Sequence, residues 1–381
     1  MTTHLTLTNA TLVLPDRVVP NGTVRVEDGT IKDISYGGSA VPGAIDCEGD
    51  YVTPGLVELH TDNLEKHLSP RPGVRWPASS GVLAHDSQLA SAGITTSFDA
   101  LTVGDSQPDG LRTKILGESI ETITALQEGG HTRAEHFIHL RCEISTPNVA
   151  TLFAELAVHP LLKLVSVMDH TPGQRQWVDL EKYRARNSAL LRLDEKGLDE
   201  LINRRLSDQQ KYSDLNRSAI VQVARSRGLP IASHDDTSVE HVEEAKAAGI
   251  SISEFPTTLV AAEAARKQRM AIVMGAPNVI RGGSHSGNVA ALELVERGLL
   301  DILSSDYVPS SLLHAAFVLQ DKADITLNHA FDMVAGAPAV SVGLVDRGAI
   351  AVGKRADLLW VKRLDDGPLV RMVWRAGRRV S

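Results

Sequence analysis

The sequence places a histidine and an aspartate two residues apart, His60 and Asp62, at the end of the apolar run LVELHT. On a β-strand, residues i and i+2 point to the same side, so both side chains are expected to face one way. An imidazole and a carboxylate offer the nitrogen and oxygen donors that divalent transition metals accept. A single His-x-Asp is weak evidence, because buried histidines and acids also pair with each other without metal.

Residues of the same kind recur where four later apolar runs end, at Glu143, His170, His234 and Asp306. In a barrel of parallel strands the carboxyl ends form the active-site face, so residues far apart in the chain converge there. Mutual ion pairing remains the alternative for any one of them. Three imidazoles and three carboxylates, all at strand ends, together favour metal binding.

Six donors exceed what one tetrahedral ion with an open position needs. We therefore expect two divalent metal ions, with Glu143 as the bridging carboxylate. The donor set does not distinguish zinc, manganese and iron. Such a pair lowers the pKa of bound water, and Asp306 is the expected general base that takes the proton from the attacking water.

Basic residues lie close in the sequence to these candidate ligands. They are Lys66, Arg71, Arg141 and Arg175. A lone basic residue is usually solvated, but four beside candidate ligands indicate a polyanionic substrate, since arginine binds phosphate through two parallel N–H groups. Lys66, Arg71 and Arg175 are the expected substrate contacts.

The run GAPNVIRGGSHSGN at 275–288 is a second candidate for phosphate binding. Its glycines let the backbone approach a ligand, and a helix expected from Asn288 would add N-terminal amides. The run lacks the lysine of a P-loop, and a tight turn with satisfied polar groups is the alternative. The expected contacts are Arg281, Gly282, Gly283, His285 and Ser286.

Eight apolar runs between residues 56 and 306 are expected to be strands, with charged amphipathic segments between them. Several are apolar throughout, as is typical of parallel strands buried on both faces. The alternation predicts an α/β protein with a (β/α)8 TIM-type barrel. The expected strands are Leu56–Thr61, Thr95–Leu101, His136–Glu143, Leu162–Met168, Ile231–His234, Ile250–Phe255, Ala271–Gly275 and Ile302–Asp306. The expected helices include Gly110–Glu128, Val239–Ala248 and Asn288–Arg297.

Both ends of the chain read as short strands and turns, and neither end is long enough to fold alone. We expect residues 1–52 and 343–381 to build one small β-sandwich domain beside a barrel of residues 53–342. A hairpin is expected through Asp28 and Gly29. The other expected strands are Leu5–Leu14, Thr23–Glu27, Thr30–Ser35, Ile350–Val352, Asp357–Val361, Leu369–Trp374 and Arg378–Val380.

Residues 179–227 are highly charged and helical in pattern, with expected breaks at Asn187 and Gly197. This segment is too long for a simple connector and predicts an insertion of several helices. A lid or specificity element on the catalytic face and an oligomerisation surface both stay open.

The bulk composition bounds the partners. The 381 residues are 43% hydrophobic and 23% charged, which suits one large domain with a smaller one. A net charge of −8 argues against nucleic acid or an anionic membrane as partner. Two cysteines cannot form a disulfide framework. We see no signal peptide and no apolar run of ~18 residues, so a cytoplasmic protein is expected.

Two runs, TPGLVELHTDNLEKH at 53–67 and GAIAVGKRADLLWV at 348–361, resemble the amidohydrolase superfamily, whose β-domain and barrel meet at such sequences. Longer runs resemble a narrower family, the diphosphatases of the carbon–phosphorus lyase pathway, from about residue 3 to about residue 380. These runs are HTDNLEKHLSPRPGVRWP, HLRCE, VSVMDHTPGQRQ, ASHDD, EFPTT, MGAPNVIRGGSHSGN and DILSSDY.

The narrower resemblance implies hydrolysis of α-D-ribose 1-methylphosphonate 5-triphosphate to the 5-phosphate and diphosphate in bacterial phosphonate catabolism. It also implies that the six strand-end residues carry the metals. The chain departs from the wider superfamily in having His-x-Asp for His-x-His and in having Glu143 where a carboxylated lysine is usual. His170 and His234 fall on the fourth and fifth strands, where the superfamily has its histidines on the fifth and sixth.

Two other functions stay open. An amidohydrolase acting on a cyclic amide, an N-acyl group or a deaminase substrate would not need the basic residues near the ligands. A non-catalytic scaffold of the same fold would have no reason to keep unpaired strand-end ligands. The expected partner is thus a small phosphorylated ribose phosphonate, and self-association into a homo-oligomer is a further open question.

Overall fold

The computed structural model of the chain describes residues 4–71, 73–104, 111–191, 193–284 and 287–381. Their strands form two eight-stranded sheets. The chain packs into two compact units. The first unit comprises Met1–Asp99, Thr122–Phe137 and Met274–Ser381, and the second comprises Ala100–Glu121 and Ile138–Val273.

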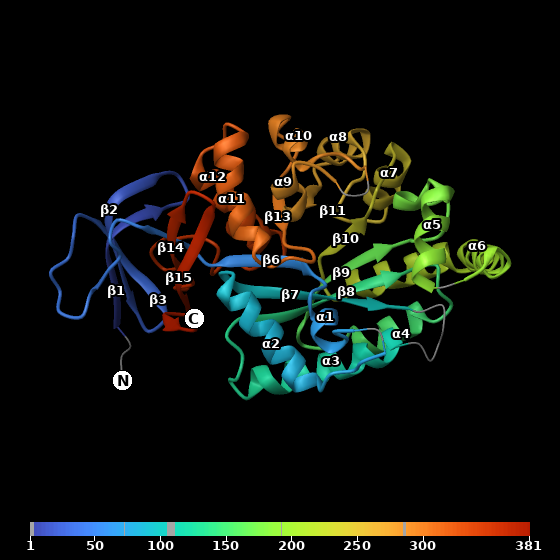
Figure 1. The fold of residues 1–381 in the computed structure, drawn as a ribbon, viewed down its shortest axis with the longest axis horizontal. Coiled ribbons are helices and arrows are strands. Elements are labelled where there is room, and N and C mark those ends of the chain that lie inside the picture. The colour runs from blue at the N-terminus through green and yellow to red at the C-terminus, as the bar shows by residue number, and fades with distance from the viewer. Residues whose placement is uncertain (1–3, 72, 105–110, 192, 285–286) are drawn as a thin grey trace. The chain divides into compact units, whose positions relative to one another are not determined.

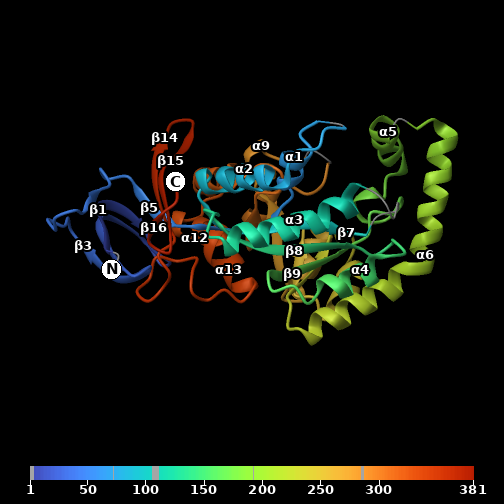
Figure 2. The same ribbon diagram turned by 90° about the horizontal axis from the view of Figure 1, so that it is seen from below.

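The first sheet combines the two ends of the chain, as predicted, and it is mostly antiparallel. Its order is β16–β15–β14–β5–β1–β2–β3, and β4 pairs with β1. In Figures 1 and 2 the red strands β14 and β15 lie beside the blue strands of the N-terminus. The bounds are β1 His4–Val13, β2 Val18–Glu27, β3 Thr30–Tyr36, β4 Ile45–Asp46, β5 Tyr51–Pro54, β14 Leu358–Leu364, β15 Gly367–Arg375 and β16 Arg378–Arg379.

Apolar residues from both ends of the chain make one core beneath this sheet. Leu7, Leu12 and Val24 of the N-terminal strands pack in one cluster with Trp360 and Trp374. Buried and more exposed positions alternate from Val24 to Glu27 at the end of β2, as a strand with one solvated face requires.

The predicted hairpin between β2 and β3 is confirmed. Glu27 pairs with Thr30, so the loop contains only two residues. Those residues, Asp28 and Gly29, have φ of 46° and 74°. Positive φ at both positions matches the twist of the flanking strands, and aspartate and glycine tolerate it best.

The strand expected at Ile350–Val352 is wrong. These residues lead into a turn in which the amide of Lys354 donates to the carbonyl of Ala351 at 3.1 Å, with Gly353 at φ 89°. The short apolar run reflects burial of Ile350 in the core and not a place in the sheet.

The second sheet is the predicted parallel barrel, and its strand order β6 to β13 follows the chain. Its first and last strands are joined by a parallel bridge between Thr61 and Asp306. The predicted strand count is confirmed, and β6, β9, β10 and β12 have the predicted bounds. The bounds are β6 Leu56–Thr61, β7 Ile94–Val103, β8 Glu135–Glu143, β9 Leu162–Met168, β10 Ile231–His234, β11 Ile252–Glu254, β12 Ala271–Gly275 and β13 Ile302–Ser304.

Helices alternate with the barrel strands as expected. Among the described helices, none combines the length and apolar character that crossing a membrane requires. The bounds are α1 Leu64–Leu68, α2 Ala78–Ser91, α3 Leu111–Glu128, α4 Val149–Leu156, α5 Leu180–Leu191, α6 Glu195–Ser226, α7 Val239–Ala247, α8 Leu259–Lys267, α9 Ala276–Arg281, α10 Ala291–Glu296, α11 Ser311–Lys322, α12 Leu327–Phe331 and α13 Ala337–Ser341. A 3₁₀ turn, η1, spans Arg175–Trp177, and a π-helical turn, η2, spans Asp332–Gly336.

The glycine-rich run at 275–288 differs from the expected loop. Its first part is the helix α9, and Gly282 ends that helix in a left-handed conformation with φ 75°. The next helix, α10, begins at Ala291 rather than at Asn288. Pro277 in the first turn of α9 explains the helix, since proline is favoured there.

The insertion at 179–227 is helical, but both expected breaks are wrong. Helix α5 continues through Asn187, whose side-chain amide donates to the Tyr183 carbonyl at 2.9 Å. Gly197 lies in the first turn of α6, where its amide donates to the N-cap Asp194 at 2.8 Å. Figure 2 shows α6 as one long helix that changes direction partway along its length, with α5 beside its first part.

Candidate active site

Three residues that lie one or two positions after the end of a barrel strand have strained backbones. Asp235, Phe255 and Asp306 come after β10, β11 and β13 with φ of 57°, 56° and 55°. A left-handed conformation at a non-glycine residue costs about 1–3 kcal/mol and persists only where the surroundings enforce it. Such strain collects at functional sites, and here it turns side chains at strand ends.

In the second unit, two predicted ligands meet around an unpredicted one. The Nε2 atoms of His170 and His234 lie 3.5 and 3.4 Å from Oδ2 of Asp235. That oxygen is buried, and no group among the described residues hydrogen-bonds to it. The three side chains together could hold one metal ion.

The other nitrogen of each ring is held by a glutamate. Nδ1 of His170 lies 2.7 Å from Glu143, and Nδ1 of His234 lies 2.7 Å from Glu254. A carboxylate on one ring nitrogen fixes the tautomer and directs the other nitrogen to a metal. Glu143 also accepts hydrogen bonds from the His170 amide at 3.0 Å and from the hydroxyl of Ser145 at 2.9 Å. Glu143 thus orients His170, and its bridging role stays a prediction.

The spacing of this set fits a tetrahedral metal. Ligands at zinc bond lengths of about 2.0–2.1 Å in tetrahedral geometry lie about 3.3 Å from one another. The distances of 3.4 and 3.5 Å from the Asp235 oxygen to the two imidazole nitrogens agree with that spacing. The donors and the buried oxygen without a hydrogen bond therefore suit a divalent ion.

Charge in this set is balanced by a proton when no metal is present. Burial opposes the imidazolium of His170, but the carboxylates of Glu143 and Asp235 outweigh it and raise its pKa to about 9. For His234 burial dominates and lowers the pKa. A metal ion that binds here would replace the proton on His170, so its affinity rises with pH.

Two arginines of the second unit lie close to His234 of the candidate metal set. Nη2 of Arg141 is 3.4 Å from Nε2 of His234, and its buried Nε has no hydrogen-bond partner among the described residues. Arg175 is buried with φ 45°, donates to the His234 carbonyl at 3.1 Å and pairs with Asp236. Arg141 thus faces the candidate metal position, whereas Arg175 fixes the turn after β10.

In the first unit, the seam between β6 and β13 brings together three other predicted ligands. The Asp306 amide donates to the carbonyl of His60 at 3.0 Å, and the Asp62 amide donates to the carbonyl of Asp306 at 3.3 Å. Oδ1 of Asp62 is buried and has no hydrogen bond from a described residue. A carboxylate oxygen in that condition is suited to a cation.

Glu58 is fully buried beneath this seam, and the sequence analysis did not single it out. Its carboxylate accepts from the amides of His60 at 2.6 Å and Ser305 at 2.5 Å and pairs with the hydroxyl of Ser304. Burial raises the pKa of Glu58 to about 7. One side chain therefore ties β6 to β13 directly behind His60.

The predicted substrate contacts of the first unit differ in their surroundings. Lys66 is exposed, and its ammonium donates to the Tyr307 carbonyl at 2.5 Å, one residue after Asp306. Arg71, Arg281 and Gly282 are exposed, and Gly283 is half-buried. His285 and Ser286 lie outside the described residues.

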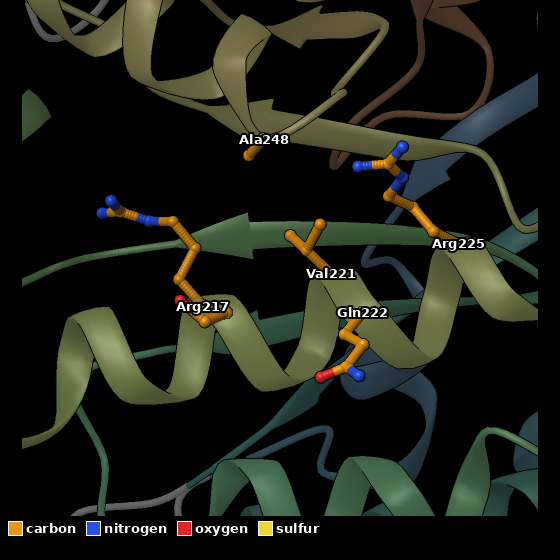
Figure 3. Close-up of a pocket in the computed structure, with 6 residues that line it drawn as sticks. Arg217, Val221, Gln222, Arg225 and Ala248 are labelled. Carbon is orange, nitrogen blue, oxygen red and sulfur yellow. The ribbon is translucent and has the colours of Figure 1, made fainter.

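The second unit also contains a hollow, which is lined by residues of α6 and by Ala248. Its volume is about 360 Å³, and Figure 3 shows Arg217, Val221 and Arg225 projecting from α6 toward the side of Ala248. Ser218 and Gln222 complete its lining, which thus contains no predicted site residue. Arg217 is paired with Glu244, so its charge is already balanced.

Besides Glu58, the residues of these sets that were not predicted from the sequence are Asp235 and Glu254. Asp235 follows His234 in the run SHDD, and Glu254 is the last residue of β11. Position at a strand end was the signal available for both. A left-handed turn reverses the side-chain direction expected from strand alternation, which hid Asp235.

A parallel eight-stranded barrel with imidazoles and carboxylates at its strand ends defines a metal-dependent hydrolase. The chain belongs to the amidohydrolase family, whose sequence model matches residues 169–381. It is 46% identical to the alpha-D-ribose 1-methylphosphonate 5-triphosphate diphosphatase of Escherichia coli (strain K12), over 98% of this chain and 99% of that protein.

Solved structures with the same fold are more distant in sequence. Molinate hydrolase superposes with a TM-score of 0.67 at 14% identity, covering 99% of this chain and 94% of that one. The 5-methylcytosine deaminase of Klebsiella pneumoniae gives 0.66 at 15% identity, covering 99% and 97%. At these identities the likeness shows the fold alone.

Proposed function

We propose that this protein hydrolyses α-D-ribose 1-methylphosphonate 5-triphosphate to the 5-phosphate and diphosphate. The observation that carries the proposal is the 46% identity to a diphosphatase of that substrate over nearly the whole of both chains. The site supports it, since basic side chains accompany the ligand sets in both units.

The proposal assigns metal ligands within each unit. In the second unit, Asp235 joins His170 and His234, while Glu143 and Glu254 orient the two rings. In the first unit, His60, Asp62 and Asp306 are the ligands. The expectation of two ions, zinc, manganese or iron, is part of the proposal. A bound divalent ion supplies water of lowered pKa and polarises a phosphoryl oxygen.

The remaining residues act on protons and charge. Asp306 takes the proton of the attacking water, because its strained backbone turns its carboxylate at the end of β13. Arg141 and Lys66 neutralise charge that develops on the phosphoryl oxygens. Arg71, Arg281 and the segment 282–286 are assigned to the rest of the phosphate chain, whereas Arg175, predicted as a further contact, is paired with Asp236 and supports the turn after β10.

Incubation of the metal-loaded protein with the triphosphate, followed by ³¹P NMR, tests the proposal. We expect diphosphate to form in one step together with the 5-phosphate. Stepwise release of orthophosphate, or no turnover of the triphosphate with hydrolysis of a cyclic amide instead, would contradict it. A protein without turnover of any of these substrates and without bound metal would be a scaffold.

The metal assignment is tested by Asp235→Asn, which removes the charge but keeps the shape. We expect loss of tightly bound metal and a fall in kcat of at least about 100-fold, since outer partners alone are worth 10–100-fold. Elemental analysis and kinetics are the measurements. Asp214→Asn is the control, because Asp214 is 96% exposed in the same unit. Unchanged metal content in Asp235→Asn would sink the assignment.

A further inference from the structure

Four ionisable side chains of the first unit form a continuous buried chain that no part of the proposed reaction uses. His85 and Asp86 lie on α2, Asp99 on β7 and His136 on β8, and each is completely shielded from solvent. Burying four ionisable groups is costly unless each is paired. Each of the four side chains is hydrogen-bonded to at least one of the others.

The protons along the chain can be assigned from its distances. Both nitrogens of His136 face carboxylates, with Nδ1 at 2.7 Å from Asp99 and Nε2 at 3.2 Å from Asp86. Although burial opposes the charge, the two aspartates raise the pKa of His136 to about 10, so the ring donates from both nitrogens. Nε2 of His85 lies 2.8 Å from the other oxygen of Asp99 and donates to it. Nδ1 of His85 is therefore an acceptor.

These residues have the composition of a metal site but not its spacing. The distances of 2.7 and 2.8 Å from Asp99 to the two histidines are hydrogen-bond lengths. They are well below the about 3.3 Å that separates tetrahedral zinc ligands. The set around Asp235 has that larger spacing, so the two clusters differ in kind.

The last member of this buried chain of side chains contacts Asn63, which is the residue after the proposed ligand Asp62. The side-chain Nδ2 of Asn63 lies 3.2 Å from Nδ1 of His85 and 2.8 Å from the side-chain Oε1 of Gln88. His67 reaches the same oxygen of Gln88 at 2.9 Å. The two amide protons of Asn63 are thus both used, and α1 is attached to α2 at each of its ends.

Asp62 depends on this attachment because its own side chain has little support. Its Oδ1 has no hydrogen bond from a described residue, so its direction is set by the backbone on either side. On one side the Asp62 amide is bonded to the carbonyl of Asp306. On the other side the backbone is fixed by the side chain of Asn63.

We propose that Asn63, held by the chain His85–Asp99–His136–Asp86, is a positioning residue that fixes Asp62 as a metal ligand and Lys66 as a substrate contact. This inference rests on the proposed metal role of Asp62. In this proposal the buried side chains orient a metal ligand that they do not contact directly.

Asn63→Ala and His85→Phe each interrupt the buried chain of hydrogen-bonded side chains. Leu89→Ala is the matched control. Leu89 is also fully buried on α2, so its truncation weakens the same helix without touching the chain. Affinities for Zn²⁺ and Mn²⁺ are measured by competition with a chromophoric chelator on the full-length protein, with circular dichroism as the check on folding. We expect about tenfold weaker metal binding in Asn63→Ala and His85→Phe and no change in Leu89→Ala.

Kinetics on the triphosphate separate positioning from general damage. With saturating metal, kcat of Asn63→Ala should return toward that of the wild type, while KM stays raised through Lys66. Asp62→Ala should lose metal that no excess restores. If His85→Phe fails to fold, Asn63→Ala alone decides.

Two results overturn the inference in distinguishable ways. Wild-type metal affinity in Asn63→Ala, together with metal loss in Asp62→Ala, would show that the chain is only structural. Wild-type metal content in Asp62→Ala would instead remove the proposed ligand and the inference with it. An equal loss of affinity in Leu89→Ala would assign the effect to the stability of α2.

Discussion

His136 is a cation held between two aspartates in a place that water does not reach. A buried charge is tolerated only when its partners outweigh the lost hydration, and two carboxylates do so here. The consequence is a histidine that stays charged at a pH where free histidine is neutral. Its contribution to stability must therefore depend on pH.

His136→Gln should destabilise the protein more at pH 6 than at pH 9. The folded-state pKa of His136 is raised from 6.5 to about 10. Its contribution is thus complete below pH 6.5 and is lost as pH rises through 10. Urea unfolding of both proteins across this range measures it. His85, whose lowered pKa acts in the opposite sense, is present in both proteins and largely cancels in the difference.

His131→Gln is the control, because His131 is exposed in the same unit. A stability difference between wild type and His136→Gln that stays constant with pH would contradict the prediction. A constant difference between wild type and His131→Gln is expected.

Single residues also show where the sequence could and could not predict the site. His60, Glu143, His170, His234 and Asp306 could be singled out as candidates because period-two alternation and strand ends are visible in a sequence. Asp235 could not, because the backbone turn that aims it depends on contacts made by the folded chain. His85, Asp99 and His136 lie on three different elements. The sequence around any one of them does not indicate that the other two are its partners.

Helix α6 is attached to the loop that follows Glu143. The Asn216 side-chain amide donates to the carbonyls of Ile144 and Thr146, both at 2.8 Å. Gln209, two turns earlier on the helix, lies 3.4 Å from Asp169, the neighbour of His170. The insertion therefore supports the loops after β8 and β9, which favours a role near the ligands for this part of it.

Asn216→Ala should destabilise the protein by about 1–3 kcal/mol, because two buried carbonyls lose their donor. It should also weaken metal binding by loosening the loop after Glu143. Thermal unfolding and metal titration measure the two effects. Leu215→Ala is the control, since Leu215 is 71% exposed on the adjacent position of the helix. Equal effects of the two variants would show that α6 does not support the loop.

The elements were more predictable than the breaks between them. Strands β6 and β10 are buried throughout and β9 and β12 along most of their length, so their bounds could be predicted from short, largely apolar runs between turn residues. Breaks at Asn187 and Gly197 were expected from local propensity, which tertiary packing overrides. Gly197 is instead used at a capped helix start, where the Asp194 side chain accepts its amide.

The small β-domain proposed from residues 1–52 and 343–381 depends on both ends of the whole molecule. Removal of 343–381 would take Leu358, Trp360 and Trp374 out of the shared core. It would also leave β5 without its partner β14. An unpaired strand edge over an opened core promotes aggregation.

Deletion of residues 343–381 should therefore give insoluble protein, and co-expression of that segment as a separate chain should restore part of the soluble yield. Leu369→Ser is the control, because Leu369 is 48% exposed on β15. A soluble and cooperatively folded truncation would show that the N-terminal strands do not need the C-terminal ones.

The pairing of β5 with β14 can form only late in the synthesis of the protein. Tyr51–Pro54 leaves the ribosome long before Leu358–Leu364 exists, and at ~5–20 residues per second the wait is roughly 15–60 s. Barrel closure waits almost as long, because Ser304 must reach Glu58 across 246 residues. During that interval the backbone N–H and C=O groups at this edge of β5 are unpaired and can bind other chains in the cell. We expect ribosome-associated chaperones to bind there, and slow codons between the barrel and β14 to lower the yield.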